Sequence, residues 1–418
     1  MIKVLIPVYE YYPLNSGGTF RLAKFSKYLR EYGIEPIVVA PNWESTNSKY
    51  VDESMIGIKT CRVERVNFDK KHKLKRTINF VLYKITLHPK FFDDNIGENI
   101  LHRCKQICQS EKIDVIFASS LPQYTHWVAN ELNKQFKIPW VADFRDIVDQ
   151  EEITIKNLLI RFIKYLRMKH TLLLDVYFAK SACNVITVSD GLKEKLVKRF
   201  KIPVNVIMNG FDPEDFSEYY VKDINYKRNE KLTIVYAGSF FGNRTPKVLL
   251  DGLENLVNRK PELVNNIQIL FYGRSSESIK KYVVSKECRK MIVSGGLLTH
   301  QEAIRKMMLA DILYLISHPS KGIVTGKIFE YLATNKLILS IPGDKDITDE
   351  IIRATNSGII ASTPEEVADT LLKLYDEWMD NGQIHSLTKI NMVELYTRKK
   401  QSQELAEILK KGMNCDRE

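Results

Sequence analysis

The chain has 418 residues, of which 44% are hydrophobic and 27% charged. This composition is typical of a soluble globular protein and excludes a fibrous or disordered one, and the length predicts two to three domains of about 150 residues. The six cysteines include no CxxC pair and accompany no histidine cluster, so neither a disulfide framework nor a zinc site is expected. Cys104 and Cys108, four residues apart, are interpreted as apolar residues on one buried helix face.

The positive charge is concentrated in the first half of the chain. Residues 1–209 carry 33 Lys and Arg against 22 Asp and Glu, whereas residues 210–418 carry 29 of each. The first half is therefore expected to meet something anionic: nucleic acid, an anionic membrane face or a phosphorylated acceptor. The N-terminus has no signal-peptide pattern, and no run approaches about 18 apolar residues, so a cytoplasmic protein is expected.

The first half alternates short apolar strands with helices. The expected strands are Lys3–Val8, Pro36–Ala40, Lys59–Val66, Val115–Ala118, Trp140–Ala142, Val185–Val188 and Val204–Ile207. The expected helices are Phe20–Tyr32, Glu98–Glu111, Tyr124–Gln135, Ile153–Ser181 and Gly191–Phe200. This alternation predicts βαβ units around a buried parallel sheet.

A second series of the same kind follows a turn-rich, acidic segment, Asn209–Phe216, and a polar run, Lys222–Lys231. Its expected strands are Leu232–Ala237, Ile267–Tyr272, Met291–Ser294, Ile312–Ile316, Leu337–Ile341 and Gly358–Ala361, and the helices between them include Ser276–Ser285. The sequence thus predicts two doubly wound α/β domains, 1–208 and 232–389, a linker at 209–231 and a last helical pattern at 390–411. Such sheets bind ligands at the carboxyl ends of their strands.

Two glycine-bearing loops each follow the first strand of a domain. Gly17 and Gly18 stand at a helix start, where backbone N–H groups can approach a ligand, although a plain strand-to-helix turn would look the same. In the second loop, Gly238 and Arg244 combine glycine, guanidinium and a helix start, which are the parts of a phosphate cradle. The alternative there is a solvated loop arginine.

Charged residues cluster at two further places. Asp143, Arg145 and Asp146 follow a strand, where they predict either a functional group of charges or an Arg–Asp bridge that holds the loop. The sharper pattern lies near Gly326, where free N–H groups and Lys327 suit a phosphate and Glu330 could accept hydrogen bonds from two vicinal hydroxyls such as those of a ribose. A weak Lys–Glu surface pair is the alternative.

Two basic stretches of the first half are interleaved with apolar residues. Lys70–Arg76 precedes the apolar run Ile78–Ile85, and Ile155–Leu174 carries Lys156, Arg161, Lys164, Arg167 and Lys169 at helical spacing. This pattern suits a helix on an anionic bilayer, or else an ordinary packed amphipathic helix. Nucleic acid is disfavoured, because no helix-turn-helix or stacking-aromatic module stands out.

Several of these segments together resemble a known family. They are Gly17-Gly18, Pro139–Asp146, Val188-Ser189, Asn209–Phe216 and Gly326–Leu332, and in this order they are similar to the retaining, family-4-type glycosyltransferases of GT-B fold. The closest resemblance is to the bacterial members that build capsule, exopolysaccharide or O-antigen units. It covers nearly the whole chain.

The resemblance implies a fold and a reaction. Two Rossmann-like domains would face each other across a cleft, with the acceptor held by residues 1–208, the nucleotide sugar by 232–389, and the helix at 390–411 crossing back onto the first domain. The enzyme would move a sugar from a UDP- or GDP-sugar to a polyprenyl-diphosphate-linked or other anionic acceptor at the inner face of the plasma membrane. Neither metal nor cofactor would be needed, because cations and helix N-termini stabilise the departing diphosphate.

The resemblance also assigns roles by position. Arg244 and Lys327 would grip the diphosphate and Glu330 the ribose. The other donor-binding positions, in the glycine loops, at the base and at the sugar, would be Gly17, Gly18, Gly238, Gly296, Leu297, Ile323, Val324, Thr325 and Gly326.

Two positions depart from the family pattern. Gly322 replaces the first acidic residue of a pair spaced by seven, so backbone N–H groups of 323–326 would have to contact the sugar. Arg145 stands where many relatives have a histidine, and Asp143, Arg145 and Asp146 are expected in the catalytic cleft.

Two other functions compete with this prediction. One is a nucleotide-sugar 2-epimerase of similar fold, which needs no membrane patch. The other is a non-catalytic nucleotide-sugar-binding relative, a role that the loss of the acidic residue at Gly322 would fit. Release of nucleoside diphosphate from a panel of nucleotide sugars separates the three.

Overall fold

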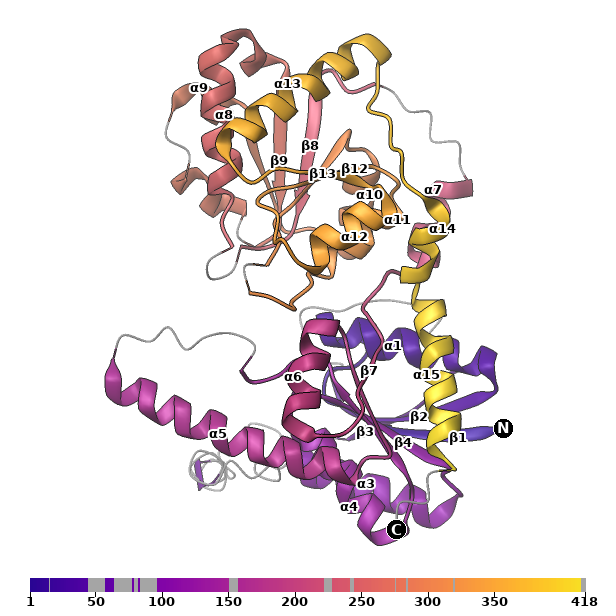
Figure 1. The fold of residues 1–418 in the computed structure, drawn as a ribbon. Coiled ribbons are helices and arrows are strands. Elements are labelled where there is room, and N and C mark those ends of the chain that lie inside the picture. The colour runs from indigo at the N-terminus through magenta and orange to yellow at the C-terminus, as the bar shows by residue number, and fades with distance from the viewer. Residues whose placement is uncertain are drawn as a thin grey trace. The chain divides into compact units, whose positions relative to one another are not determined.

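The computed structural model describes residues 1–14, 16–43, 57–63, 77–78, 82, 96–149, 157–221, 228–240, 244–274, 276–282, 285–318 and 320–414. The chain divides into two compact units, Met1–Met208 with Arg398–Glu418, and Asn209–Thr397 (Figure 1). Each unit is built on its own parallel sheet, which confirms the predicted α/β class with two doubly wound sheets.

The sheet of unit 1 has seven strands in the order β3-β2-β1-β4-β5-β6-β7. They are β1 (Ile2–Pro7), β2 (Ile34–Pro41), β3 (Lys59–Val63), β4 (Val115–Ser120), β5 (Trp140–Phe144), β6 (Asn184–Thr187) and β7 (Asn205–Val206). All neighbours are parallel, with Ile2 opposite Ile34 at the start of the β1–β2 ladder and Ile116 opposite Trp140 in the β4–β5 ladder. The strand order reverses between β1 and β4, which makes this pair the topological switch point of the sheet.

Helices cover both faces of this sheet. They are α1 (Gly17–Leu29) with the 3-10 turn η1 (Arg30–Tyr32), α3 (Ile96–Ser110), α4 (Tyr124–Phe136), α5 (Leu158–Ser181), α6 (Asp190–Phe200) and α15 (Arg398–Gly412). Alternate residues of β1 face opposite sides, as the pleat requires. Val4 and Ile6 pack with Leu405 of α15, whereas Leu5 packs with Ile100 of α3. Two cores, one on each face, therefore hold the sheet.

Unit 2 has six parallel strands in the order β10-β9-β8-β11-β12-β13. They are β8 (Leu232–Ala237), β9 (Ile267–Tyr272), β10 (Ile292–Gly296), β11 (Ile312–Leu315), β12 (Leu337–Ser340) and β13 (Gly358–Ile360). The helices are α7 (Ser217–Val221), α8 (Lys247–Arg259), α9 (Lys286–Lys290), α10 (His300–Met308), α11 (Lys327–Ala333), α12 (Ile347–Thr355), α13 (Pro364–Asn381) and α14 (Ile390–Val393), with 3-10 turns η5 (Pro213–Phe216), η6 (Pro261–Asn265), η7 (Ser276–Lys281) and η8 (Glu394–Tyr396). The switch point of this sheet lies between β8 and β11.

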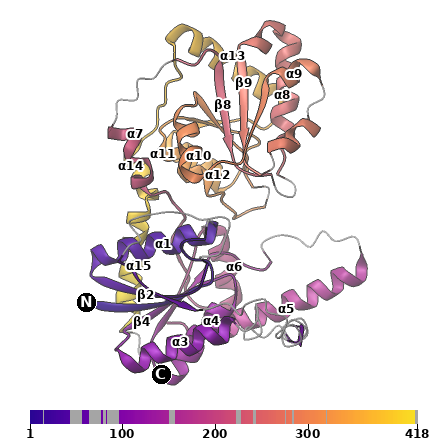
Figure 2. The ribbon, with the colours of Figure 1, turned by 180° about the vertical axis from the view of Figure 1, so that it is seen from behind.

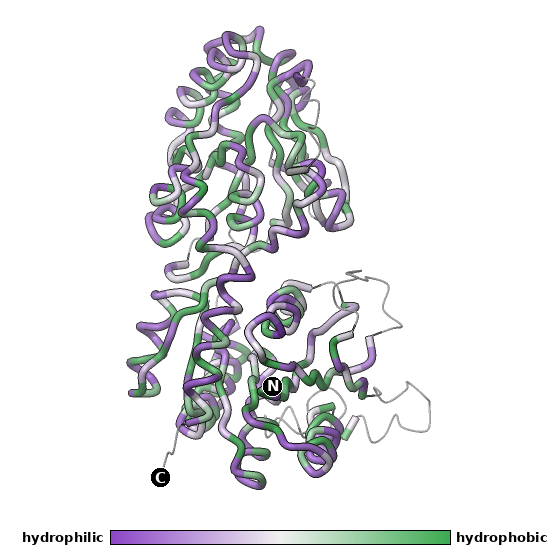
Figure 3. Tube along the Cα trace, turned by 90° about the vertical axis from the view of Figure 1, so that its right-hand side faces the viewer, coloured by the Kyte–Doolittle hydropathy of each residue, from purple (hydrophilic) through white to green (hydrophobic). Residues whose placement is uncertain are grey.

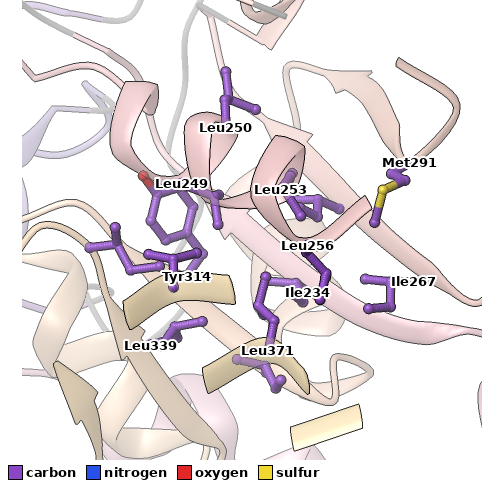
Figure 4. Close-up of a cluster of buried hydrophobic side chains, with 14 of the residues drawn as sticks. Ile234, Leu249, Leu250, Leu253, Leu256, Ile267, Met291, Tyr314, Leu339 and Leu371 are labelled. Carbon is purple, nitrogen blue, oxygen red and sulfur yellow. The ribbon is translucent and has the colours of Figure 1, made fainter. Parts of the chain in front are cut away.

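The core of unit 2 forms where α8 and α13 cover one face of the sheet. Leu249, Leu253 and Leu256 recur along α8 at helical spacing and lie in one cluster with Ile234 of β8 and Leu371 of α13 (Figure 4). The same alternation of hydrophobic and hydrophilic residues is visible along the helical traces of both units (Figure 3).

Some predicted elements differ from the structure. Of the predicted helix Ser276–Ser285, residues 276–281 form the 3-10 turn η7 instead of an α-helix. The helical pattern 390–411 is broken at Thr397, whose backbone is extended (φ −80°, ψ 145°), so α14 and η8 belong to unit 2 and α15 to unit 1. The predicted linker begins inside unit 2, where the Phe211 N–H donates to the Tyr396 carbonyl at 3.1 Å. The basic stretch Lys70–Arg76, together with Lys156 and residues 241–243, lies outside the described residues.

The structure also bears on two general expectations. Within the described ranges, no helix combines the length and hydropathy that crossing a membrane requires.

On α3, Cys104 is fully buried and Cys108 partly buried, and burial raises the pKa of the Cys108 thiol to about 11. Both side chains therefore pack as small apolar groups rather than as reactive thiolates.

Candidate functional site

Gly18 lies at the switch point of unit 1, with charged side chains packed directly over it. A Cβ atom on Gly18 would collide with the Glu10 carboxylate, which follows β1, and with the Arg145 guanidinium, which follows β5. The neighbouring Gly17 has open space, with no heavy atom within 4 Å of the point that a Cβ atom would occupy. Of the two predicted glycines, then, only Gly18 lies under packed side chains, whose charged ends a Cβ atom would displace. Helix α1 starts beside them, where the Ser16 hydroxyl accepts from the Thr19 N–H at 3.2 Å.

Arg145 stands between two carboxylates at this edge. Its Nε donates to Asp146 at 2.8 Å, and its Nη1 lies 4.0 Å from the Glu10 carboxylate. The side chains remain partly open to solvent, 17% for Arg145 and 43% for Asp146. The structure therefore brings Gly18, Arg145 and Asp146 together. It adds Glu10, for which no motif in the sequence gave a signal.

Asp143 has a different place from its two predicted companions. It is completely buried, and its carboxylate accepts from Arg21 Nε and Nη2, both at 3.2 Å, and from the Ser119 hydroxyl at 2.8 Å. Arg21 is equally buried and also donates to the Met208 carbonyl at 3.0 Å. An ion pair so enclosed ties α1 to the end of β5 and to Met208. Both carboxylates thus take part in an Arg–Asp bridge, Asp146 with Arg145 as the alternative has it, and Asp143 with Arg21.

Arg244 lies at the switch point of unit 2. It follows β8, and its Nη2 donates to the carbonyl of Ile316, which follows β11, at 3.2 Å. Its Nε is buried and has no hydrogen-bond partner among the described residues. The Arg244 guanidinium thus connects the ends of β8 and β11, and its Nε–H group is still available to a ligand. An unmet buried N–H is costly unless a ligand completes it.

Backbone hydrogen bonds connect the carboxyl end of β8 to that of β9, and that of β9 to that of β10. The Gly238 N–H donates to the Tyr272 carbonyl at 2.9 Å, and the Gly273 N–H donates to the Gly296 carbonyl at 2.7 Å. Gly273 has φ +127°, and a Cβ there would collide with the Gly238 carbonyl, so only glycine fits. The predicted Gly238 and Gly296 therefore lie on the same edge of the sheet. Leu297, which follows Gly296, is 70% exposed.

Lys327 and Glu330 contact each other in the structure. Lys327 Nζ donates to Glu330 Oε2 at 2.5 Å, and the two side chains are 28% and 25% exposed. They stand one turn apart on α11, beside Gly326, around which a Cβ would have open space. The surface-pair alternative describes this geometry. The same geometry leaves a cation and a carboxylate half-open at the edge where β8 and β11 end.

Gly322 owes its identity to the backbone. Its φ is +80°, in the left-handed region that glycine adopts without strain. Its N–H donates to the Asp346 carboxylate at 2.5 Å, from the loop that follows β12. A carboxylate therefore contacts the Gly322 backbone, and it comes from 24 residues further along the chain.

Among the residues that the structure describes, no three side chains of His, Cys, Asp or Glu are grouped so that they could hold a metal ion. The predicted backbone contacts Ile323, Val324 and Thr325 lead into α11, and the Thr325 carbonyl accepts from the Ile328 N–H at 3.3 Å. All predicted residues of unit 2 lie along one edge of its sheet, at or beyond the carboxyl ends of β8, β10 and β11.

Part of the chain matches a known protein family. Residues 16–215 match the profile of the family described as Glycosyltransferase Family 4. No curated protein sequence gives a significant match.

Solved structures with the same fold are numerous. Sucrose-phosphate synthase from Thermosynechococcus elongatus is similar over 98% of this chain and 99% of its own, with a TM-score of 0.62 and 11% identity. HepE from Anabaena in complex with UDP is similar over 98% of this chain and 100% of its own, with a TM-score of 0.60 and 13% identity. WaaG, a glycosyltransferase involved in lipopolysaccharide biosynthesis, is similar over 97% of this chain and 99% of its own, with a TM-score of 0.59 and 14% identity.

These likenesses span both units, so the two sheets, each with its own switch point, form a GT-B fold. The family profile covers residues 16–215, which is less than half of the 418-residue chain. The comparisons therefore show the fold of the chain and a likeness of residues 16–215 to Glycosyltransferase Family 4.

Proposed function

We propose that this enzyme transfers a sugar from a UDP- or GDP-sugar to a lipid-linked saccharide during the synthesis of a surface polysaccharide such as capsule or lipopolysaccharide. The reaction would retain the anomeric configuration, need no metal, and take place at the inner face of the plasma membrane. The observation that carries the donor side is Arg244, whose guanidinium joins the ends of β8 and β11 and keeps a buried Nε without a partner among the described residues.

The donor is assigned to residues 232–389, which lie within unit 2. A departing nucleoside diphosphate gains negative charge in the transition state, and a fixed guanidinium and a nearby ammonium stabilise that charge. Arg244 and Lys327 supply these two groups. The Glu330 carboxylate would leave Lys327 for the hydroxyls of the ribose, and the exposed Leu297 next to Gly296 would lie against the base. HepE, a protein of similar fold, has been seen with UDP and with UDP-glucose, which favours a uridine donor.

The acceptor is assigned to unit 1, residues 1–208. Gly17, Gly18, Arg145 and Asp146 lie at its switch point, where a doubly wound sheet takes its ligand. Arg145, 17% exposed and held by Asp146, is the cation best placed to meet the reacting groups. Asp143 would act through Arg21, as a positioning residue.

A membrane-borne acceptor is supported by charge. The excess of basic over acidic residues lies wholly within residues 1–209, and basic residues near an anionic bilayer each contribute about 1 kcal/mol of binding. The similar fold of WaaG, which acts in lipopolysaccharide biosynthesis, fits the same class of acceptor.

The test is release of nucleoside diphosphate from a panel of UDP- and GDP-sugars, with and without membrane extract and with a chelator present. We expect release from one donor, strongly stimulated by the extract and unaffected by the chelator. Conversion of the donor to its 2-epimer without extract would replace the proposal with an epimerase. Binding of UDP or GDP without any turnover would leave a non-catalytic relative.

A further inference from the structure

Helix α5 of unit 1 displays an unusual number of apolar side chains to solvent. Nine large hydrophobic residues along it are 44% to 78% exposed: Leu158, Leu159, Ile160, Phe162, Ile163, Tyr165, Leu166, Leu173 and Tyr177. A surface helix normally turns such residues toward the core. Clusters of this kind on a protein surface mark an interaction site.

Within the part of unit 1 that the structure describes, only the C-terminal part of α5 is attached to the other elements. The buried residues of the helix are Asp175, Phe178 and Ala179. Gln123 Nε2, at the start of α4, donates to Asp175 at 2.7 Å and to the Thr171 carbonyl at 2.9 Å. Residues 158–166, by contrast, are all exposed, and the helix extends beyond the sheet and the other helices of unit 1 in both views (Figures 1 and 2).

Five of the nine apolar residues form a stripe on the side away from this attachment, and the other four are spread around the exposed N-terminal turns of the helix. At about 100° per residue, Leu159, Phe162, Leu166, Leu173 and Tyr177 fall within an arc of roughly 60°. The three buried residues are centred roughly 180° away from that arc. The most hydrophobic face of α5 therefore points outward, opposite to the face by which the helix is held.

The charges of α5 select the partner. The helix carries Arg161, Lys164, Arg167, Lys169 and Lys180, and its single acidic residue, Asp175, is buried. By the same count of about 100° per residue, Lys169 lies roughly 20° from the edge of the stripe and Lys180 at its edge, where long side chains can reach phosphate while the stripe is covered, and Arg161, Lys164 and Arg167 lie on the other side of the helix. A second copy of the chain would bring the same positive charges against these, which disfavours self-association.

We propose that α5 docks on an anionic lipid bilayer, lying along the surface with the stripe Leu159, Phe162, Leu166, Leu173 and Tyr177 in the headgroup–acyl boundary. This is the arrangement of an interfacial amphipathic helix. The stripe spans roughly 19 residues, about 28 Å of helix. The inference rests on the proposed function only in that a lipid-linked acceptor gives the docking a purpose; the surface itself is independent of the donor site.

Vesicle flotation tests the docking directly. The full chain is mixed with vesicles of phosphatidylcholine alone or with phosphatidylglycerol added, and compared with the triple variant Leu159→Glu/Phe162→Glu/Leu166→Glu. We expect the wild type to float with anionic vesicles and the triple variant to lose at least about tenfold in bound fraction. The matched control is Leu387→Glu, an apolar residue of unit 2 that is 74% exposed and should bind like the wild type.

A second variant reports insertion without removing apolar area. In Phe162→Trp, we expect the tryptophan emission to shift to shorter wavelength on addition of anionic vesicles. Val197→Trp, on the neighbouring α6 and 38% exposed, should not show this shift. Flotation of the triple variant at the wild-type level, or an unshifted Phe162→Trp spectrum, would overturn the proposal. So would a wild type that ignores vesicles but sediments as a dimer that the triple variant loses.

UDP binding, measured by calorimetry on the same proteins, separates the two proposals. A triple variant that binds UDP like the wild type but fails to float supports docking by α5. A wild type that floats but binds no nucleotide would contradict the donor assignment and leave the docking intact.

Discussion

Arg244 and Lys327 are the two cations that unit 2 places at the edge formed by β8 and β11. We predict that Arg244→Ala and Lys327→Ala each lower the turnover number about a hundredfold, because losing one such contact with a developing diphosphate costs about 3 kcal/mol. Steady-state rates of nucleoside diphosphate release check this. The control is Lys247→Ala, which removes an exposed lysine paired with Asp251 on α8 and should keep full activity. Wild-type turnover in Lys327→Ala would show that the cradle does not include it.

Gly18 and Gly17 provide a natural matched pair. A methyl group on Gly18 displaces the Glu10 and Arg145 side chains, whereas one on Gly17 meets open space. We therefore expect Gly18→Ala to lose at least about tenfold in kcat/KM and Gly17→Ala to lose almost nothing. Equal activity of the two variants would mean that the position of Arg145 has no bearing on the reaction.

At this scale, part of the candidate site was predictable and part was not. Motifs near glycines and strand ends pointed to Arg145, Asp146, Arg244, Lys327 and Glu330. The contacts Arg145–Asp146 and Lys327–Glu330 join residues one and three positions apart, which a local pattern can register. The partners of Asp143 and Gly322 come from distant segments. Arg21 precedes Asp143 by 122 residues, and Asp346 follows Gly322 by 24, so no local pattern could assign them.

Among the elements, α5 has an attachment whose strength should depend on pH. Burial raises the pKa of Asp175 to about 6, and the hydrogen bond from Gln123 offsets this only in part. An acid with a raised pKa in the folded state is protonated more readily there than in the unfolded chain. Its contribution to stability therefore improves as pH falls from about 6 toward its unfolded value near 3.8, and is unfavourable above.

We accordingly predict that Asp175→Asn, which mimics the protonated acid, raises the free energy of unfolding at pH 7 by on the order of 2 kcal/mol relative to the wild type. Near pH 4 the difference should vanish. Urea denaturation at several pH values checks this. The buried His126, whose pKa burial lowers to about 4, has the opposite pH dependence in both proteins and cancels from the comparison. A constant difference at every pH would argue against titration of Asp175.

Strand and helix periodicity predicted most elements, because apolar runs and the 3.6-residue spacing report burial directly. The tail is the instructive failure. Residues 390–411 have one helical pattern, yet Thr397 is extended because the chain passes from one unit to the other there. Periodicity shows which residues are apolar, but it does not show whether they pack into the core of unit 1 or that of unit 2.

For the whole molecule, the asymmetry of charge yields a prediction that does not depend on α5. Reversing Lys71, Lys73, Lys75 and Arg76 to glutamate should weaken binding to anionic vesicles several-fold and leave nucleotide affinity unchanged, because the donor site is assigned to unit 2. Co-sedimentation at low and high salt checks this, since screening reduces such attraction over about 8 Å at physiological salt. Equal binding to neutral and anionic vesicles would assign the basic residues to a soluble anionic acceptor instead.

The path of the chain has a consequence for how proteins of this fold diversify. Unit 2 is a single uninterrupted stretch, Asn209–Thr397, set into unit 1, which contains both chain termini. The two ends of that stretch lie side by side, since Phe211 and Thr397 pair as a parallel bridge. Recombination between related genes at these two positions would therefore replace one whole module without cutting through either hydrophobic core. A lineage could in this way change what unit 2 recognises while it keeps unit 1 unaltered.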